Sequence, residues 1–194
     1  MEPALLSRSL KLAVLGCTLL AGGCDRGADA PAQPQESAAA TPPDAPGAAS
    51  KKLDRSHKGE PLPRITVKDA EGKTLALPSL KGKPALVNLW ATWCAPCIAE
   101  LPTLDAIAAE GRIAVVTVSQ DMGKPEEVAA FLKAKGGENL PAWLDPENDL
   151  AFQYGGGVLP TSVLYDAEGR EVWRYVGGNE WDNAEARALL AEAG

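Results

Sequence analysis

Apolar runs with few polar interruptions mark the buried strands of this chain. Residues Ala85 to Trp90 are apolar except for Asn88, and Ile113 to Ser119 forms a second such run. Continuous runs of this length are typical of strands that are covered on both faces. Shorter strands are predicted where apolar and polar positions alternate or where turn residues flank the run. These shorter strands are Arg64–Lys68, Thr74–Leu77, Thr161–Tyr165 and Glu171–Val176.

Helical spacing of apolar residues appears in other segments. The pattern predicts a helix over Ala95–Ala109, with Leu101 and Leu104 on one face, and another over Pro125–Lys135, which opens on a proline. Two further helices are predicted at Leu150–Tyr154 and Asn183–Ala193. The predicted strands and helices alternate along most of the chain, and a β-hairpin precedes the last helix. The sequence therefore predicts an α/β fold with a central mixed β-sheet flanked by helices on both faces.

The first residues have the pattern of an export signal. Arg8 and Lys11 precede the apolar run Leu12–Ala21, which is too short to span a bilayer. The residues Leu20-Ala21-Gly22-Gly23-Cys24 that complete this region resemble a bacterial lipobox. The resemblance implies that residues 1–23 are a lipoprotein signal peptide and that Cys24 is lipidated. The alternative is an ordinary cleaved signal that leaves a free thiol at Cys24.

Composition separates a linker from a domain. Residues 24–56 are rich in Ala, Pro, Gln and Ser, and they are predicted to be a lipidated, disordered linker. Residues 57–194 are predicted to form one domain. Asp25, which follows the lipidated residue, implies by resemblance to other lipoproteins that the chain stays at the inner membrane and faces the periplasm. His57, the single histidine, is interpreted as a solvated linker residue. The chain has a net charge of -7 and no basic patch, so nucleic acid is not an expected partner.

Cys94 and Cys97 form a Cys-x-x-Cys motif between a predicted strand and a predicted helix. A zinc site needs about four ligands, and the predicted domain offers these two cysteines and a distant histidine. A structural disulfide at this spacing would close a very small loop, and the stabilisation from a cross-link grows with loop length. A redox-active dithiol is therefore the favoured interpretation.

The two cysteines are predicted to have different roles. Cys94 lies at the helix N-terminus, where unpaired N–H groups favour a thiolate, so it is expected to be partly exposed and to attack a substrate disulfide. Cys97 lies one turn further in and is expected to resolve the mixed disulfide. Pro96 fits the first helical turn. Trp93 is expected to pack beside the sulfurs, and the alternative is a core aromatic residue.

The segment Asn88 to Cys97 resembles the active-site segment of the thioredoxin superfamily, in particular the TlpA/ResA-like membrane-anchored thiol–disulfide oxidoreductases. The resemblance covers about Glu60 to the C-terminus and implies a thioredoxin-like fold. It also implies that the lipid-anchored protein acts as a thiol–disulfide oxidoreductase on protein substrates.

Two further segments resemble the substrate groove of that family. The loop around Pro160 resembles its cis-proline loop, which implies a cis bond before Pro160 and a substrate strand that pairs with the backbone of Leu159. The residues Val176-Gly177-Gly178 resemble the loop that forms the third side of the groove. The substrate-binding residues implied are Trp93, Pro96, Leu159, Pro160 and Gly178.

Asn88 and Glu100 set this chain apart from ordinary thioredoxins. Asn88 stands where thioredoxins have a buried Asp, and an amide does not act as a carboxylate base. ResA-like members instead carry a Glu three residues after the second cysteine, and Glu100 occupies that position. If Glu100 is partly buried, its pKa rises and it becomes a proton acceptor for Cys97. The alternative is a surface Glu near a helix start.

The expected activity is reduction of disulfides in extracytoplasmic proteins. The dipeptide Ala95-Pro96 lacks the histidine found in strongly oxidising relatives, so a reduction potential of roughly −200 to −270 mV is expected. The resemblance implies a membrane electron donor of DsbD/CcdA type. It implies apocytochrome c or copper-site proteins as substrates, in cytochrome c maturation or in assembly of the copper site of cytochrome oxidase. No cofactor and no metal are expected.

Two alternatives from other classes stay open. Thr92-Trp93-Cys94 loosely resembles a peroxidatic cysteine loop, which would indicate a peroxiredoxin-like peroxidase. A copper chaperone would need a further ligand, and Met122 lies far from the motif in the sequence. The segments expected to carry substrate specificity, around Gly155 and Trp181, contain no pattern that names a substrate.

Overall fold

A mixed sheet forms the centre of the protein in this computed structural model, which describes residues 52–194. Its eight strands lie in the order β1-β8-β7-β4-β5-β6-β2-β3. The strands are β1 (Lys52–Asp54), β2 (Thr66–Lys68), β3 (Thr74–Ala76), β4 (Ala85–Trp90), β5 (Ala114–Ser119), β6 (Trp143–Leu144), β7 (Thr161–Tyr165) and β8 (Glu171–Val176). The predicted signal peptide, the lipidation at Cys24 and the linker up to residue 51 lie outside the described residues.

The register of the central strands brings three chain segments to one edge. Strand β4 runs parallel to β5 and antiparallel to β7, and β7 is antiparallel to β8. Leu89 pairs with Thr161, and Thr161 pairs with Val176. The end of β4, the start of β7 and the end of β8 therefore lie side by side. We call this the Leu89 edge.

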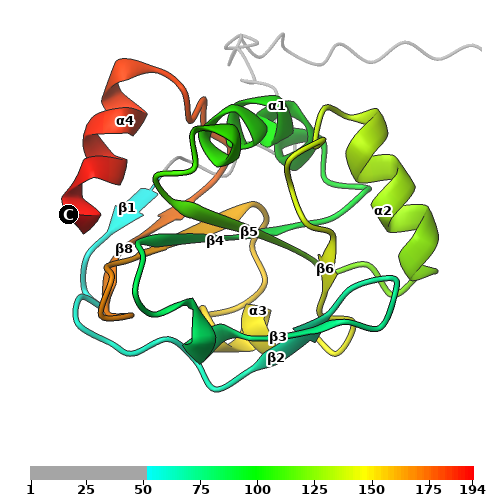
Figure 1. The fold of residues 1–194 in the computed structure, drawn as a ribbon, viewed down its shortest axis with the longest axis horizontal. Helices are drawn as coiled ribbons and strands as arrows, with labels where there is room; N and C mark the ends of the chain where they lie inside the picture. Colours follow the sequence, from blue (N-terminus) through cyan, green and yellow to red (C-terminus); the bar gives the residue numbers. More distant parts are fainter. Residues whose placement is uncertain (1–51) are drawn as a thin grey trace, which may run out of the picture. The chain divides into compact units, whose positions relative to one another are not determined.

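Four α-helices and two short 3-10 helices cover the sheet. The α-helices are α1 (Ala95–Glu110), α2 (Pro125–Ala134), α3 (Asp149–Gln153) and α4 (Ala184–Leu190), and the 3-10 helices are η1 (Leu77–Leu80) and η2 (Ala191–Ala193). Helices α1, α2 and α4 lie over one face, and α3 lies against the other (Figure 1). The predicted α/β fold with helices on both faces of a mixed sheet is confirmed.

Two apolar clusters lie on opposite sides of β4, because alternate residues of a strand point to opposite faces. Leu86 and Trp90 join the cluster under α1, α2 and α4, whereas Val87 and Leu89 join the cluster with α3. All six residues of β4 are buried. This explains the nearly continuous apolar run in the sequence.

The predicted ends of β4, β7 and β8 are correct, and the differences elsewhere have local causes. Helix α1 continues to Glu110 because Gly111, with φ 69°, ends it in the left-handed conformation. The predicted strand over Thr74–Leu77 ends at Ala76, where η1 begins. The predicted C-terminal helix is divided into α4 and η2.

The folded domain begins earlier in the chain than the predicted boundary at residue 57. Strand β1 lies inside the predicted linker, and it pairs antiparallel with β8, with Leu53 opposite Tyr175. His57 is likewise part of the folded domain, where its Nδ1 lies 2.9 Å from Glu60 Oε1. A three-residue strand has too little pattern of its own to be recognised in the sequence, because it depends on the partner strand.

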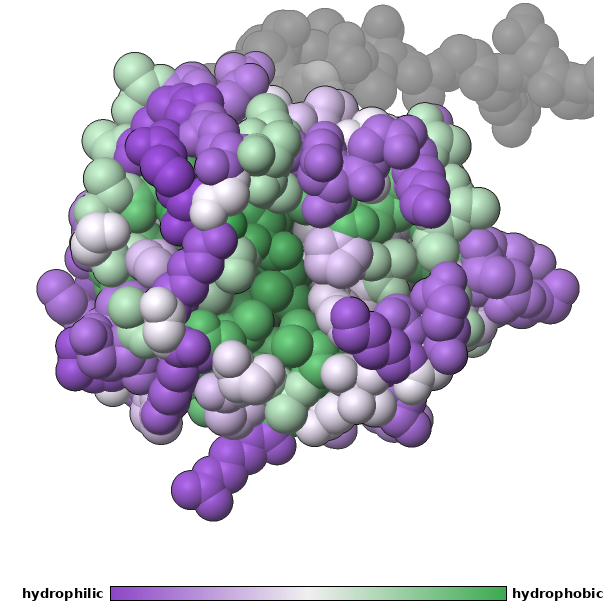
Figure 2. All heavy atoms as spheres, in the orientation of Figure 1, coloured by the Kyte–Doolittle hydropathy of each residue, from purple (hydrophilic) through white to green (hydrophobic). Residues whose placement is uncertain are grey.

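The surface of the described part is mixed in character. On the face shown in Figure 2, hydrophobic residues reach the surface in a hollow near the middle and hydrophilic residues surround them. Among residues 52–194, no helix has both the length and the apolar character required to cross a bilayer.

Candidate active site

Cys94 and Cys97 form a disulfide at the start of α1. Their sulfur atoms are 2.01 Å apart, and the structure therefore represents the oxidised protein. Cys94 is the N-cap residue, and its Sγ accepts a hydrogen bond from the backbone N–H of Cys97 at 3.3 Å. Pro96 lies in the first turn, where a helix loses nothing from a missing N–H. The motif is thus held at a helix N-terminus, as predicted.

The surroundings of the disulfide differ in part from those predicted. Cys94 is 5% exposed and Cys97 is wholly buried, so Cys94 is more enclosed than expected but remains the more accessible sulfur. Trp93 is 71% exposed, and it is not a core residue. Its side chain lines a surface hollow between the active-site loop and α2, together with Phe131.

The predicted groove residues come together around the dithiol. The Leu159–Pro160 peptide bond is cis, as predicted. The carbonyl of Pro160 accepts a hydrogen bond from the N–H of Gly177 at 2.9 Å, which joins the cis-proline loop to the loop after β8. The next residue, Gly178, lies so close to Pro96 that a Cβ at this position would stand 3.3 Å from both the Cβ and the carbonyl oxygen of Pro96. Leu159 itself is partly buried and packs against the core.

Asp121 holds the loop that precedes the disulfide. Its carboxylate accepts hydrogen bonds from the backbone N–H and the hydroxyl of Thr92, at 2.9 and 2.7 Å. The hydroxyl of Ser119, at the end of β5, donates to the same carboxylate at 2.7 Å. The end of β5 therefore fixes the position of the active-site loop.

Glu100 lies one turn beyond Cys97 on α1 and is 2% exposed. Asn88 Nδ2 donates to its Oε1 at 2.8 Å. The backbone N–H of Asn179 and the indole N–H of Trp181 donate to its Oε2, at 2.9 and 3.1 Å. Asn88 Nδ2 also donates to Ser162 Oγ at 2.9 Å. The carboxyl group is therefore enclosed by three neutral donors, one from β4 and two from the loop after β8.

Burial raises the pKa of Glu100 from 4.5 to about 7, and the hydrogen bonds from Asn179, Asn88 and Trp181 oppose this rise. A buried carboxylate loses the hydration that stabilises its charge, and only a nearby cation or strong donors offset that loss. A group that titrates near neutral pH is suited to accept and return a proton. Glu100 is buried, as the proton-acceptor hypothesis requires, and the alternative of a surface Glu is wrong.

The sequence did not reveal every residue around Glu100. Ser162 is a polar residue within a buried strand, and it pairs with Asn88 across β7 and β4. Asn88 and Ser162 are both polar residues inside buried strands, and this pattern could have indicated a buried polar contact. Asn179 and Trp181 gave no such signal, because their contact with Glu100 joins positions that are far apart in the sequence.

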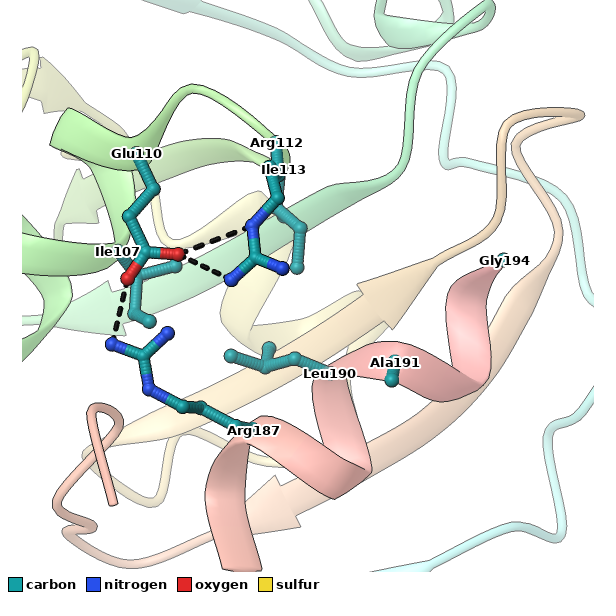
Figure 3. Close-up of a pocket in the computed structure, with 8 residues that line it drawn as sticks. All are labelled: Ile107, Glu110, Arg112, Ile113, Arg187, Leu190, Ala191 and Gly194. Carbon is teal, nitrogen blue, oxygen red and sulfur yellow. Dashed lines mark hydrogen bonds and ion pairs between the residues drawn. The ribbon is translucent and has the colours of Figure 1, made fainter. Parts of the chain in front are cut away.

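A pocket of about 300 Å³ lies at the other end of α1 and is separate from the dithiol. Glu110 lies between the guanidinium groups of Arg112 and Arg187, and Leu190 projects into the hollow (Figure 3). From Cys94 to this pocket, α1 spans about 24 Å, at 1.5 Å for each of its 16 residues. In the described part of the chain, no three His, Cys, Asp or Glu side chains are grouped so that they could hold a metal ion.

Comparison with known proteins agrees with this geometry. The model of the AhpC/TSA family matches residues 58–172. The chain belongs to the AhpC/TSA family. Within it, the chain is similar to the thiol-disulfide oxidoreductase ResA of Bacillus anthracis, with 32% identity over 120 residues. The match covers 61% of this chain and 69% of ResA.

Two solved structures resemble this member of the AhpC/TSA family. A thiol:disulfide interchange protein of the DsbE type from Chlorobium tepidum superposes with a TM-score of 0.62 at 27% identity, over 71% of this chain and 98% of the other. The pneumococcal exposed lipoprotein thioredoxin of Streptococcus pneumoniae superposes with a TM-score of 0.54 at 34% identity, over 66% and 98%. The fold is thioredoxin-like, and the protein is a thiol–disulfide oxidoreductase.

Proposed function

We propose that this oxidoreductase works as a reductase of protein disulfides outside the cytoplasm. The observation that carries the proposal is the buried carboxyl group of Glu100, one helical turn from the buried sulfur of Cys97 and without a cation beside it. Such a group can take a proton from a thiol that has no access to water. Ala95 and Pro96, between the cysteines, offer no charge that would stabilise a thiolate strongly, which supports a reducing couple of roughly −200 to −270 mV.

The reaction begins from the reduced dithiol. The thiolate of Cys94 attacks one sulfur of a substrate disulfide, and the other substrate sulfur leaves as a thiolate that takes up a proton. Cys97 then loses its proton to the Glu100 carboxylate and attacks Cys94 Sγ. The bond between Cys94 and the substrate breaks, and the substrate sulfur leaves as a thiolate that takes up a proton, while Glu100 can return its own proton to the solution. Two electrons have passed to the substrate, and the Cys94–Cys97 disulfide remains in the protein.

The substrate segment is proposed to lie in the groove between Pro96, the cis-proline loop and Gly178. An extended chain would pair with the backbone of Leu159 next to Pro160, as in strand addition to a sheet edge. Large exposed apolar side chains flank this position, with Trp93 71% and Val158 48% exposed. A protein substrate offers apolar residues beside its cysteines to contact such side chains.

The proposed location is the periplasm, with the protein held at the inner membrane by lipid on Cys24. The similarity to a solved lipoprotein thioredoxin supports this proposal. The proposed substrates are apocytochrome c or copper-site proteins, and the proposed electron donor is a membrane protein of DsbD/CcdA type. In cells given a labelled fatty acid, Cys24→Ala should abolish labelling of the protein, and normal labelling would contradict the anchor.

A trapping experiment tests the substrate class. Reduced Cys97→Ser protein is mixed with a Cys-x-x-Cys-His peptide in its disulfide form, as a probe for apocytochrome c. A stable mixed disulfide on Cys94, identified by mass spectrometry, is the expected result, and the Cys94→Ser variant serves as the control. Absence of the adduct would contradict a substrate of this kind. Rapid turnover of hydrogen peroxide by the unmodified protein would instead favour the peroxidase alternative.

A kinetic comparison tests Glu100. Glu100→Gln should slow the resolving step by on the order of 10²-fold at pH 7, because general acid–base groups contribute at least this much. Glu110→Gln is the matched control, since Glu110 lies at the far end of the same helix. Equal pH–rate profiles for Glu100→Gln and the unmodified protein would remove Glu100 from the mechanism. Equilibration with glutathione tests the direction, and a potential near −120 mV would contradict a reductase.

A further inference from the structure

One short segment connects the proposed substrate groove to the buried carboxyl group. It runs from Gly178 to Trp181 in the loop after β8. At its start, Gly178 contacts Pro96 so closely that a Cβ there would stand 3.3 Å from two atoms of Pro96. At its end, Trp181 is wholly buried and its indole N–H donates to Glu100. The same four residues thus touch both the surface beside the dithiol and the group that titrates beneath it.

Both hydrogen bonds to Glu100 Oε2 come from this segment. Asn179 contributes its backbone N–H at 2.9 Å and Trp181 its indole N–H at 3.1 Å. Both groups are donors only, so they stabilise the ionised carboxylate and offer no acceptor for a protonated one. A change that weakens or removes either bond would favour the protonated form of Glu100.

The end of the segment is firmly held. The Trp181 ring is stacked on Trp173 at 6.1 Å between ring centroids, and it meets Tyr175 edge to face at 5.6 Å. Its backbone N–H donates to Thr103 Oγ1 on α1 at 3.1 Å. Because Trp181 is held on several sides, a push at Gly178 is expected to move the start of the segment and to leave Trp181 in place. The hydrogen bond that gives way is then the one from the N–H of Asn179, the residue next to Gly178.

We propose that the segment Gly178–Trp181 is a positioning element that couples substrate binding in the groove to the proton affinity of Glu100. This inference rests on the proposed function for the location of the groove and for the use of the proton. A substrate chain that presses on Gly178 lengthens the hydrogen bond from the N–H of Asn179 to Oε2. Glu100 then binds a proton more tightly at the stage when Cys97 has to lose one.

Few other groups bear on the protonation of Glu100. Cys94 and Cys97 on α1 are joined in a disulfide and do not titrate in this state. Asn88 on β4 and Ser162 on β7 are neutral. Tyr175 on β8 interacts electrostatically with Glu100, and burial raises the pKa of this phenol, so it is neutral near pH 7. The segment therefore supplies the two hydrogen bonds to Glu100 that come from a loop and not from a strand of the sheet.

Two pairs of variants test the coupling in the oxidised full-length protein. The carbon-13 NMR signal of the Glu100 carboxyl group gives its titration midpoint. Trp181→Phe removes the indole donor, and the midpoint should rise by about one unit, which is a tenfold change in proton dissociation. Trp143→Phe is the control, because Trp143 lies in the apolar cluster on the other face of the sheet and makes no hydrogen bond to Glu100. This control should leave the midpoint unchanged.

The second pair applies a push without removing any donor. Gly178→Ala places a methyl group against Pro96 and should raise the midpoint by a smaller amount than Trp181→Phe. Gly123→Ala is its control, since a Cβ there meets nothing within 4 Å. An unchanged midpoint in Gly178→Ala would overturn the coupling, and an unchanged midpoint in Trp181→Phe would overturn the positioning role of the indole.

A third measurement brings in the substrate itself. In the Cys97→Ser variant, Glu100 should titrate at higher pH when a cysteine peptide is attached to Cys94 than when the protein is free. Equal midpoints in the two states would refute coupling to substrate. These NMR results do not depend on turnover. If the midpoints move as described but the pH–rate profile does not follow them, the catalytic role of Glu100 fails while the coupling stands.

Discussion

Glu100 and Glu171 are two buried glutamates in one small domain, and their partners differ completely. Each is 2% exposed. Glu171, on β8, receives two hydrogen bonds from the guanidinium group of Arg174, at 2.6 and 3.0 Å. Glu100 receives its hydrogen bonds from neutral amide and indole groups. Equal burial therefore produces an ion pair in one place and a titratable group in the other.

The two carboxylates differ in how their negative charge is stabilised. Arg174 also reaches Glu60 at 3.3 Å and lies over the ring of Tyr154, so the guanidinium group is held among fixed partners. Burial raises the pKa of Glu171, but the hydrogen bonds and the charge of Arg174 oppose that rise. Neutral donors around Glu100 compensate less, and its pKa reaches about 7. A buried carboxyl group is thus suited to proton transfer where its hydrogen-bond partners are neutral and no cation lies beside it.

The largest expected effect comes from taking the cation away from Glu171. Arg174→Met should lower the free energy of unfolding by about 3–5 kcal/mol at pH 7, because it leaves a buried carboxylate without its partner. Urea unfolding measures this change. The double variant Glu171→Gln/Arg174→Met should recover part of the loss. A loss below about 1 kcal/mol would mean that Glu171 finds water or another donor.

A smaller effect is expected from Glu100, whose contribution to the free energy of unfolding depends on pH. The folded pKa of about 7 lies above the ordinary value of 4.5 that holds in the unfolded chain, so the folded state binds the proton more tightly. This contribution to stability is fully present below about pH 4.5 and is lost as the pH rises through 7.

Between pH 5 and pH 8, the unmodified protein should therefore lose about 2–3 kcal/mol more stability than Glu100→Gln. Urea unfolding of the oxidised proteins at both pH values gives the difference. Parallel losses in the two proteins would show that Glu100 is ionised throughout this range.

The smallest effect is expected at Glu110, which lies on the same helix as Glu100 but at the surface. Hydrogen bonds from Arg187 and Arg112 lower the pKa of Glu110 to about 2, so it stays ionised from pH 5 to pH 8. Glu110→Gln should leave both the pH–rate profile and the pH dependence of unfolding as they are in the unmodified protein. A change in either would mean that charge on α1 acts on the dithiol over the length of the helix.

Sequence patterns predicted the parts of this site that depend on local chemistry. The position of the Cys94–Cys97 pair at a helix start and the cis bond before Pro160 are both found in the structure. The first follows from the spacing of the motif, and the second was implied by the resemblance of a short loop to that of the family. The buried strands β4 and β5 were equally predictable, because nearly continuous apolar runs identify them.

Features that depend on contacts between distant segments were not predicted. Strand β1 is formed by three residues and exists because β8 offers an open edge beside them. Strand β6 has two residues, and its pairing with β5 defines it. The contact of Trp181 with Glu100 depends on the path of the loop after β8, and no periodicity encodes that path. Trp93 is a largely exposed side chain, so the alternative of a core aromatic residue is wrong.

Strand β1 has a consequence for the rim beside the dithiol. Lys52 pairs with Val176, so the first described residue lies in the row that forms the Leu89 edge. Strands β1 and β4 are separated only by β8 and β7, which puts Lys52 about 15 Å from Leu89, at about 4.8 Å for each strand spacing. Strand β1 therefore widens by one strand the row of paired residues next to the active-site loop.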